Sequence, residues 1–342
     1  MTAAVLAVDG GNSKTDVALV AADGSLLAAV RGPTTSHQAV GLAEGLRRLT
    51  ELVESAARQG GLNPTARPIA SLGVHALAGA DFVADIRMLE RGLGETGLTG
   101  RDVVINDCIG ALWAGATDGW GIALVCGAGI NAAAVAPDGR VARFDGVGDI
   151  SGDWGGGNAV AMAGLGAAVR ARDGRGPRTA LERTVPAHFG LTRPAALTRA
   201  LYDRRISQDR IGELSPVVFG AAMEGDGAAR AIADRLADEI VAMAGAMLRR
   251  LRLTRLDPEI VLGGGVFRTP DLDFRSRIEA GVHAIAPRAR VVRAEAPPVA
   301  GAALLGLDAL VGGLADPAVG AKVRTALASW DAKAVAESAN GS

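Results

Sequence analysis

Residues 9–15 read Asp-Gly-Gly-Asn-Ser-Lys-Thr and connect two apolar runs, at 3–8 and 15–21. A loop of this composition between strands offers backbone N–H groups and hydroxyls to phosphate oxygens. Asp9 could hold Mg²⁺, directly or through water. The segment is not a Walker A loop, which needs GxxxxGK[ST] at the start of a helix. A tight hairpin with a merely solvated tip is the alternative, so this segment by itself leaves phosphate binding open.

Three further glycine-rich segments could bring backbone close to a ligand. Residues 127–131 join two apolar runs and, as a counterpart of the first loop, could grip the same polyphosphate. Residues 263–265 are three glycines at a strand end, where a base or ribose could lie flat, although close packing of a helix start is the alternative. Residues 146–157 hold six glycines around two aspartates and Trp154, which favours a ligand-lining loop.

Asp107 follows the apolar run 102–106 and is the candidate catalytic carboxylate. An aspartate at a strand end could take a proton from an attacking hydroxyl group. Such a residue also commonly caps the next helix, and in isolation the cap is the better interpretation.

The pattern of apolar strands and helices that must position these residues occurs about twice along the chain. Strands are expected at 3–8, 15–21, 25–31, 70–77 and 102–106, and again at 121–125, 131–136, 140–144, 259–262 and 289–293. Helices are expected at 42–56, 81–93, 109–115, 232–251, 272–286 and 300–310. The repeat predicts an α/β protein with two like domains, 1–118 and 119–315, and an interdomain cleft. The second domain carries a helical insertion at 145–227, and 316–342 form a helical tail without chemistry.

Composition excludes several classes of function. The net charge of −1 gives no electrostatic case for binding nucleic acid or an anionic membrane. No apolar run is long enough to cross a bilayer, and the N-terminus does not resemble a signal peptide, so a cytoplasmic protein is expected. The two cysteines, Cys108 and Cys126, form no CxxC pair, and the four histidines lack metal-ligand spacing.

Taken together, the loops resemble the actin-like ATPase superfamily of sugar kinases, Hsp70 and actin, whose domains are ribonuclease H-like. Residues 9–15 resemble its first phosphate loop, 127–131 its second, 262–267 its adenosine motif and 300–307 its second connecting helix. Within it the chain resembles the BadF/BadG/BcrA/BcrD ATPase family, in its N-acetylglucosamine kinase-like branch, from about residue 4 to 310. The resemblance implies an ATP-dependent carbohydrate kinase that uses ATP and Mg²⁺ on an amino sugar such as N-acetylglucosamine or glucosamine, and a homodimer.

The resemblance also assigns roles to single residues. Asp107 matches the catalytic aspartate, and Asp9 is expected at Mg²⁺. The residues expected to bind ATP are Gly10, Gly11, Asn12, Ser13, Lys14, Thr15, Gly127, Ala128, Gly129, Asn131, Gly263, Gly264, Gly265 and Phe267. The residues expected to contact the sugar are Ser36, His37, Gly79, Asp81, Asp107, Gly148 and Asp153.

Several positions depart from the kinase pattern. The segment Ser-Thr-Asn-His reads Thr-Thr-Ser-His at 34–37, and Ser-Gly-Gly-Asp reads Ala-Gly-Ala-Asp at 78–81. Ala128 and Ile130 replace the two hydroxyl residues of the second phosphate loop, and Trp154 replaces the glutamate of Gly-Asp-Glu-Gly. The missing hydroxyls keep one alternative open, a nucleotide or sugar sensor that has lost turnover. Other members of the family imply a second alternative, an ATPase that activates a radical dehydratase. The second would need an iron–sulfur cluster on Cys108 or Cys126, which are more simply interpreted as small core residues.

Overall fold

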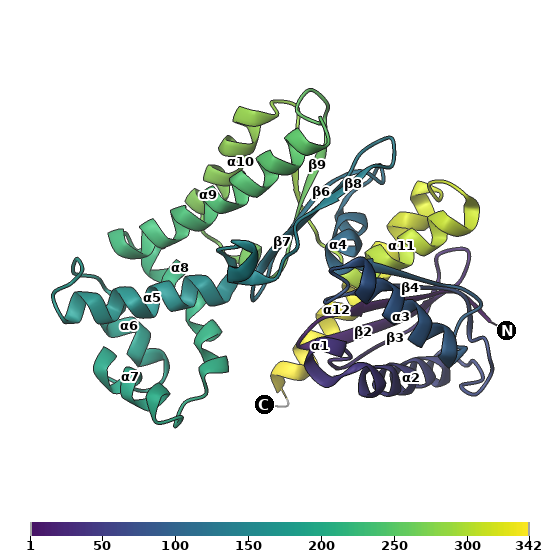
Figure 1. Cartoon of the computed structure of the whole chain (residues 1–342), viewed down its shortest axis with the longest axis horizontal. Coiled ribbons are helices and arrows are strands. Elements are labelled where there is room, and N and C mark those ends of the chain that lie inside the picture. The colour runs from purple at the N-terminus through teal and green to yellow at the C-terminus, as the bar shows by residue number, and fades with distance from the viewer. Residues whose placement is uncertain (1, 341–342) are drawn as a thin grey trace. The chain divides into compact units, whose positions relative to one another are not determined.

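The computed structural model describes residues 2–340 as strands and helices that alternate along most of the chain (Figure 1). The elements up to residue 143 are β1 (Ala3–Gly10), β2 (Lys14–Val20), β3 (Leu26–Pro33), α1 (His37–Val40), α2 (Leu42–Gln59), β4 (Ala70–Leu77), α3 (Val83–Thr96), β5 (Asp102–Asn106), α4 (Asp107–Gly115), β6 (Gly121–Cys126), β7 (Ile130–Val135) and β8 (Val141–Arg143). Those that follow are η1 (Gly148–Ser151), α5 (Gly156–Arg172), α6 (Leu181–His188), α7 (Pro194–Tyr202), η2 (Gln208–Leu214), α8 (Ser215–Met223), α9 (Gly227–Arg250), β9 (Glu259–Gly263), η3 (Gly265–Arg268), α10 (Leu272–Ile285), β10 (Arg290–Arg293), α11 (Pro298–Val311) and α12 (Pro317–Asn340).

The first sheet has the order β3-β2-β1-β4-β5. Strands β1, β2 and β3 pair antiparallel, whereas β4 runs parallel to both β1 and β5. The register places Asp9 of β1 opposite Asp16 of β2, and Asp16 opposite Arg31 of β3. Three charged side chains from three strands therefore share one face of the sheet.

Alternation along the strands gives this sheet two apolar faces. One face carries Leu6, Val8 and Leu19 and is covered by α2 and α3. The other carries Val5, Ala7 and Val74 and is covered by α4, α11 and α12. A sheet buried on both faces holds its strand ends rigidly, and the candidate residues lie at those ends.

The second sheet has the order β10-β9-β6-β7-β8. Helices α9 and α10 pack on each other and run along this sheet (Figure 1). The segment between β8 and α9 is largely helical, and α5, α6, α7 and α8 pack together there.

The chain forms two compact units. Unit 1 contains the chain up to Ala123, Ala133–Val141 and the chain from Val292 onward. Unit 2 contains Leu124–Ala132 and Ala142–Val291. Two five-stranded sheets with covering helices confirm the predicted α/β class. Within residues 2–340, no helix has the length and apolar character needed to cross a membrane.

Candidate functional site

An acidic pair lies beside the first phosphate loop in unit 1. Asp16 is fully buried and accepts hydrogen bonds from Lys14 Nζ (2.9 Å) and from Arg31 Nε (2.7 Å). Burial, together with the negative charges of Asp16 and Asp107, raises the pKa of Asp9 to about 7, although Lys14 and Arg31 oppose the rise. Asp9 is thus a half-buried carboxylate with too little positive charge around it, which is the environment that a divalent cation would relieve.

The tip of the β1–β2 hairpin exposes Asn12, Ser13 and Lys14, three of the residues expected at phosphate. The Gly11 amide donates to the Lys14 carbonyl (2.9 Å) and closes the turn. Thr15 is fully buried instead, and its hydroxyl pairs with that of Thr35 (3.0 Å). The hydroxyl of Thr15 therefore anchors the loop to the segment that follows β3.

Asp107 is the first residue of α4, but it is not the helix cap. The cap is Asn106, whose side-chain oxygen accepts a hydrogen bond from the Cys108 amide (3.1 Å). Burial raises the pKa of Asp107, the Cys108 amide opposes that rise, and the negative charge of Asp81 adds to it. Because Asn106 caps α4, the interpretation of Asp107 as the helix cap is wrong. The carboxylate of Asp107 is therefore available as a base.

Asp81 is held beside Asp107 by two amide side chains. It is 6 % exposed and accepts from Asn106 Nδ2 (3.1 Å) and Gln38 Nε2 (3.4 Å). Asn106 therefore connects the α4 cap to the predicted sugar-contacting residue Asp81. Neither Asn106 nor Gln38 was singled out from the sequence, since each lies next to a motif and has an ordinary polar side chain.

Ser36 and His37 lie where β3 leads into α1. Ser36 is 4 % exposed, and its hydroxyl has no hydrogen-bond partner among the described residues. A buried hydroxyl without a partner costs free energy that a ligand's polar group could recover. Gly79 has φ +85°, which favours glycine, and a Cβ there would lie 2.8 Å from His37 Cε1, so Gly79 leaves room for the His37 ring.

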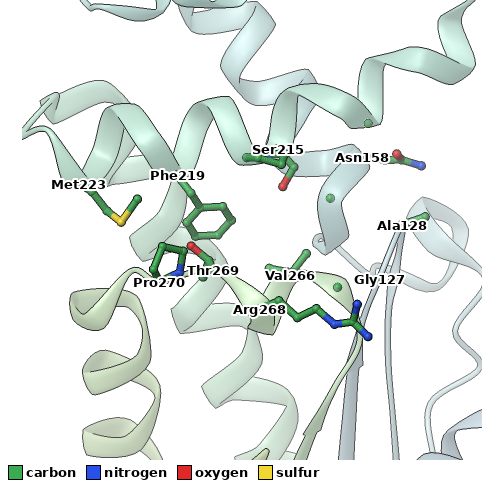
Figure 2. A pocket seen from close by; sticks show the side chains of 14 residues that line it. Gly127, Ala128, Asn158, Ser215, Phe219, Met223, Val266, Arg268, Thr269 and Pro270 are labelled. Carbon is green, nitrogen blue, oxygen red and sulfur yellow. The ribbon is translucent and has the colours of Figure 1, made fainter. Parts of the chain in front are cut away.

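Unit 2 holds a cavity of about 530 Å³ next to the second phosphate loop. Of the predicted nucleotide residues, Gly127, Ala128 and Gly265 line it. Figure 2 shows Phe219 and Met223 gathered with Thr269 and Pro270 at one end, and Ala128 with Asn158 at the other. The remaining lining residues are Gly157, Gly212, Ser215, Pro216, Val266 and Arg268. A largely apolar cavity with a few polar groups suits a flat heteroaromatic base.

The sequence did not predict the part of the lining that α8 contributes, because α8 belongs to the insertion, where no repeat gives a counterpart; these residues are Ser215, Pro216, Phe219 and Met223. The adenosine motif does reach the cavity, but not with every expected residue. Phe267 is 5 % exposed and stacks on Phe274 in the core, with ring centroids 6.4 Å apart. Gly264 has φ +102°, and a Cβ there would collide with the backbone of Cys126. Glycine is therefore needed at this position because the backbone after β9 passes close to the end of β6. Gly263 ends β9 and is buried.

The second phosphate loop offers backbone rather than hydroxyl donors. The amides of Ala128 and Gly129 donate no hydrogen bond within residues 2–340. The loop is braced from behind, because the Gly157 amide donates to the Gly127 carbonyl (2.7 Å) and the Asn158 amide to the Ala128 carbonyl (3.0 Å). Two free amides on a braced loop can receive phosphate oxygens without the missing side-chain hydroxyls.

Asn131 and Ile130 join this loop to the segment 146–157. A Cβ on Gly146 would collide with the Asn131 side chain, and one on Gly155 would lie 2.8 Å from Ile130 Cγ2. Asn131 is therefore placed to support the glycine-rich segment. Ile130, where kinases carry a hydroxyl, is 7 % exposed and packs beneath that segment.

Gly148 and Asp153 are brought together within this segment. The Asp153 amide donates to the Gly148 carbonyl (3.2 Å), and the Ser151 hydroxyl lies in hydrogen-bond contact with the Asp153 carboxylate. Trp154 stacks under Arg235 of α9, 3.7 Å from guanidinium carbon to ring centroid. Trp154, which replaces the glutamate of the kinase motif, therefore connects the segment 146–157 to α9.

Both cysteines are buried, and neither forms a disulfide. Burial raises the pKa of the Cys126 thiol to about 12, which keeps the metal-free thiol protonated and unreactive. Among the described residues, no three histidine, cysteine or acidic side chains group as a metal site would require.

Comparison with known proteins places the chain in a family. The model of the BadF/BadG/BcrA/BcrD ATPase family matches residues 6–306. The chain belongs to this family. The match confirms the resemblance predicted from the loops.

Two curated relatives and one solved structure extend the comparison. The N-acetylmuramic acid/N-acetylglucosamine kinase of Clostridium acetobutylicum is 28 % identical over 263 residues, which cover 77 % of this chain and 85 % of the relative. The N-acetyl-D-glucosamine kinase of Dictyostelium discoideum is 26 % identical over 318 residues, 89 % of this chain and 97 % of the relative. A candidate N-acetylglucosamine kinase from Chromobacterium violaceum has a TM-score of 0.68 at 23 % identity and covers 90 % of this chain and 99 % of its own. This likeness confirms the predicted two-domain fold.

Proposed function

We propose that this family member is an ATP-dependent kinase that phosphorylates a hydroxyl group of an amino sugar such as N-acetylglucosamine or glucosamine. The observation that carries the proposal is Asp107, a half-buried carboxylate with a raised pKa that is relieved of helix capping by Asn106. The two curated relatives support the reaction class, since both are named as kinases of N-acetylated amino sugars.

Unit 1 supplies the acceptor side of the proposed reaction. Ser36, with its unpartnered hydroxyl, and Asp81, held by Asn106 and Gln38, would bind sugar hydroxyls. Asp107 would take the proton of the attacking sugar hydroxyl while the oxygen of that hydroxyl forms a bond to the γ-phosphorus of ATP. The bond between that phosphorus and the β–γ bridging oxygen breaks, and ADP leaves.

Unit 2 supplies the base-binding part of the donor side, and the first phosphate loop of unit 1 would add phosphate contacts. The apolar cavity would hold the adenine base, and the amides of Ala128 and Gly129 would bind phosphate oxygens. Such transfer needs little covalent help from a protein and depends on positioning and charge neutralisation. Gly148 and Asp153 are proposed as further sugar contacts.

Asp9 fits a magnesium site, because it is a half-buried carboxylate whose pKa is raised to about 7 beside two other acidic residues. When bound, Mg²⁺ would neutralise charge on the phosphates. The domain boundaries at 118 and 315, the homodimer and the cytoplasmic location stay predictions from the sequence.

A screen of hexoses and amino sugars for sugar-dependent ADP release tests this proposal. A kinase shows ADP release that rises with one sugar and a sugar phosphate formed in equal amount. ATP hydrolysis indifferent to every sugar would favour the activator-type ATPase instead.

Ala128 is the position at which to test the sensor alternative. A sensor should bind ATP and sugar without turnover and gain turnover when Ala128→Thr restores the hydroxyl of the kinase motif.

A further inference from the structure

The C-terminal helix α12 lies outside the family match, which ends at residue 306. It nevertheless packs against the first sheet, on the face that carries Asp9 and Asp16. Val323 and Leu327 are buried in that core. The sequence predicted a tail without chemistry, but the contacts of α12 extend to charged residues beside the first phosphate loop.

Two neighbouring residues of α12 grip Arg31 of β3. The carboxylate of Asp331 lies 2.5 Å from Arg31 Nη2. The guanidinium carbon of Arg31 lies 5.2 Å from the ring centroid of Trp330, within cation–π range. The Arg31 side chain is only 18 % exposed, so these contacts hold it largely out of water.

Arg31 in turn grips Asp16 with two parallel hydrogen bonds, from Nε (2.7 Å) and Nη2 (2.8 Å). Lys14 Nζ lies 2.9 Å from the same carboxylate. A fully buried carboxylate needs a compensating cation at all times. Because Arg31 supplies that charge in a two-pronged geometry, Lys14 is a second partner of Asp16 and is not indispensable to it.

We propose that α12 is a positioning element for the first phosphate loop: Trp330 and Asp331 fix Arg31 on Asp16, so that the Lys14 ammonium group, a second partner of Asp16, can move from it to a nucleotide phosphate. The inference rests on the proposed function, since it needs phosphate at residues 9–15. Without the two α12 side chains, Arg31 can turn toward solvent. Lys14 must then stay on Asp16, and the loop loses its cation.

A helix that only stabilises the fold would pack in the same way. The test must therefore separate this structural role from the positioning of the first phosphate loop. Lys322 provides the matched control, since it anchors the same helix elsewhere. Its Nζ bonds Asp23 Oδ2 (2.9 Å) and Ser25 Oγ (2.6 Å) in the turn between β2 and β3, at the opposite end of β2 from Lys14. Lys322→Ala loosens α12 without touching Arg31.

The experiment measures binding of Mg-ADP and of adenosine by calorimetry to the full chain and its variants. The double variant Trp330→Ala/Asp331→Ala should bind Mg-ADP about 3- to 30-fold more weakly, the range for residues within a coupled network. Its affinity for adenosine, which has no phosphate, should not change, and Lys322→Ala should match the wild type for both ligands. Thermal unfolding checks each variant, and Asp331→Asn, of nearly the same size, replaces the double variant if that fails to fold.

Lys14→Ala provides the decisive comparison. It should weaken Mg-ADP binding in the wild-type background and have little further effect on Mg-ADP affinity in the α12 variant, because Lys14 is already held on Asp16 there. Thermal unfolding must show that the combined variant is folded, since Asp16 then loses Lys14 as well as the fixed Arg31. Wild-type affinity in the α12 variants, or fully additive effects of Lys14→Ala, would overturn the inference while leaving the kinase proposal intact. If the wild-type chain bound no Mg-ADP, the proposed function would fail, and this inference with it.

Discussion

Asn106 and Asp107 are adjacent in the chain, yet they hold different tasks at the start of α4. Asn106 turns its side chain to the Cys108 amide and to Asp81, so it caps the helix and fixes a neighbouring carboxylate. Asp107 is left with a raised pKa in a half-buried place. From the sequence, capping was the better interpretation of Asp107, because a side-chain hydrogen bond cannot be assigned to one of two adjacent polar residues by pattern.

Asp107→Asn keeps the shape of the side chain and removes the base. We expect turnover to fall by about 10²- to 10⁴-fold, the usual contribution of a general base. Nucleotide affinity should stay within a few-fold, because the expected nucleotide contacts lie in other segments. Steady-state kinetics with the best sugar, combined with calorimetry of Mg-ADP, measures both.

Asp138→Asn serves as the matched control for that substitution. Asp138 is an exposed carboxylate that bonds Arg140 in the turn between β7 and β8. The Asp138→Asn variant should have the same turnover as the wild type. If folded Asp107→Asn did so too, Asp107 would have no part in catalysis and the sensor alternative would gain.

Asp9→Asn tests the same acidic group through stability. Because burial raises the pKa of Asp9 to about 7, the unfolded chain releases this proton near pH 4 and the folded chain only near pH 7. The contribution of Asp9 to the free energy of unfolding therefore declines as the pH rises between these values. An uncharged side chain escapes this loss, so metal-free Asp9→Asn should melt a few degrees above the wild type at pH 8.

The comparison needs thermal unfolding in EDTA at pH 8 and at pH 4.5. The advantage of Asp9→Asn should shrink at the lower pH, where the wild-type carboxyl group is protonated, and Mg²⁺ should stabilise only the wild type. A variant less stable than the wild type at pH 8 would contradict the interpretation of Asp9 as an uncompensated carboxylate.

At the scale of elements, the apolar pattern predicted the strands and main helices of both sheets, since each is a continuous run with a clear period. It predicted less about side chains that meet across elements. The pairing of Asp9, Asp16 and Arg31 depends on the register of three strands, which the turn residues alone do not determine. The lining by α8 depends on how an insertion without an internal counterpart packs against α9.

The adenosine motif after β9 offers a pair of adjacent glycines with different roles. Gly265 lines the cavity, and a Cβ there would meet nothing within 4 Å. Gly265→Val should therefore fold normally and weaken Mg-ADP binding roughly 5- to 100-fold by overfilling the cavity. Calorimetry and a melting curve of the same sample measure the two effects.

Gly264→Ala is the contrasting variant. Its φ of +102° and the Cys126 backbone leave no room for a Cβ, so it should destabilise the fold by about 1–3 kcal/mol or more. Should Gly265→Val bind nucleotide like the wild type, the cavity would not be the nucleotide site.

At the scale of the whole molecule, the proposed acceptor and donor groups are divided between the two units. Ser36, Asp81 and Asp107 belong to unit 1, as does the first phosphate loop, and the cavity with the proposed phosphate-binding amides of Ala128 and Gly129 belongs to unit 2. Each ligand should therefore leave a distinct footprint in amide hydrogen exchange, because binding lowers local opening where contacts form.

Hydrogen exchange with each ligand added separately tests that division of roles. Mg-ADP should slow exchange in 127–131 and 263–268 of unit 2 and in 9–15 of unit 1, whereas the sugar should slow it in 34–38, 78–81 and 106–108. The segment 146–157 is the informative case, since it belongs to unit 2 but is expected to contact the sugar through Gly148 and Asp153. The sugar should protect this segment even without nucleotide, and α7, which carries none of the expected residues, should exchange equally in all samples. Protection of 146–157 by Mg-ADP alone would instead assign Asp153 to the phosphate side and leave the sugar with unit 1 contacts only.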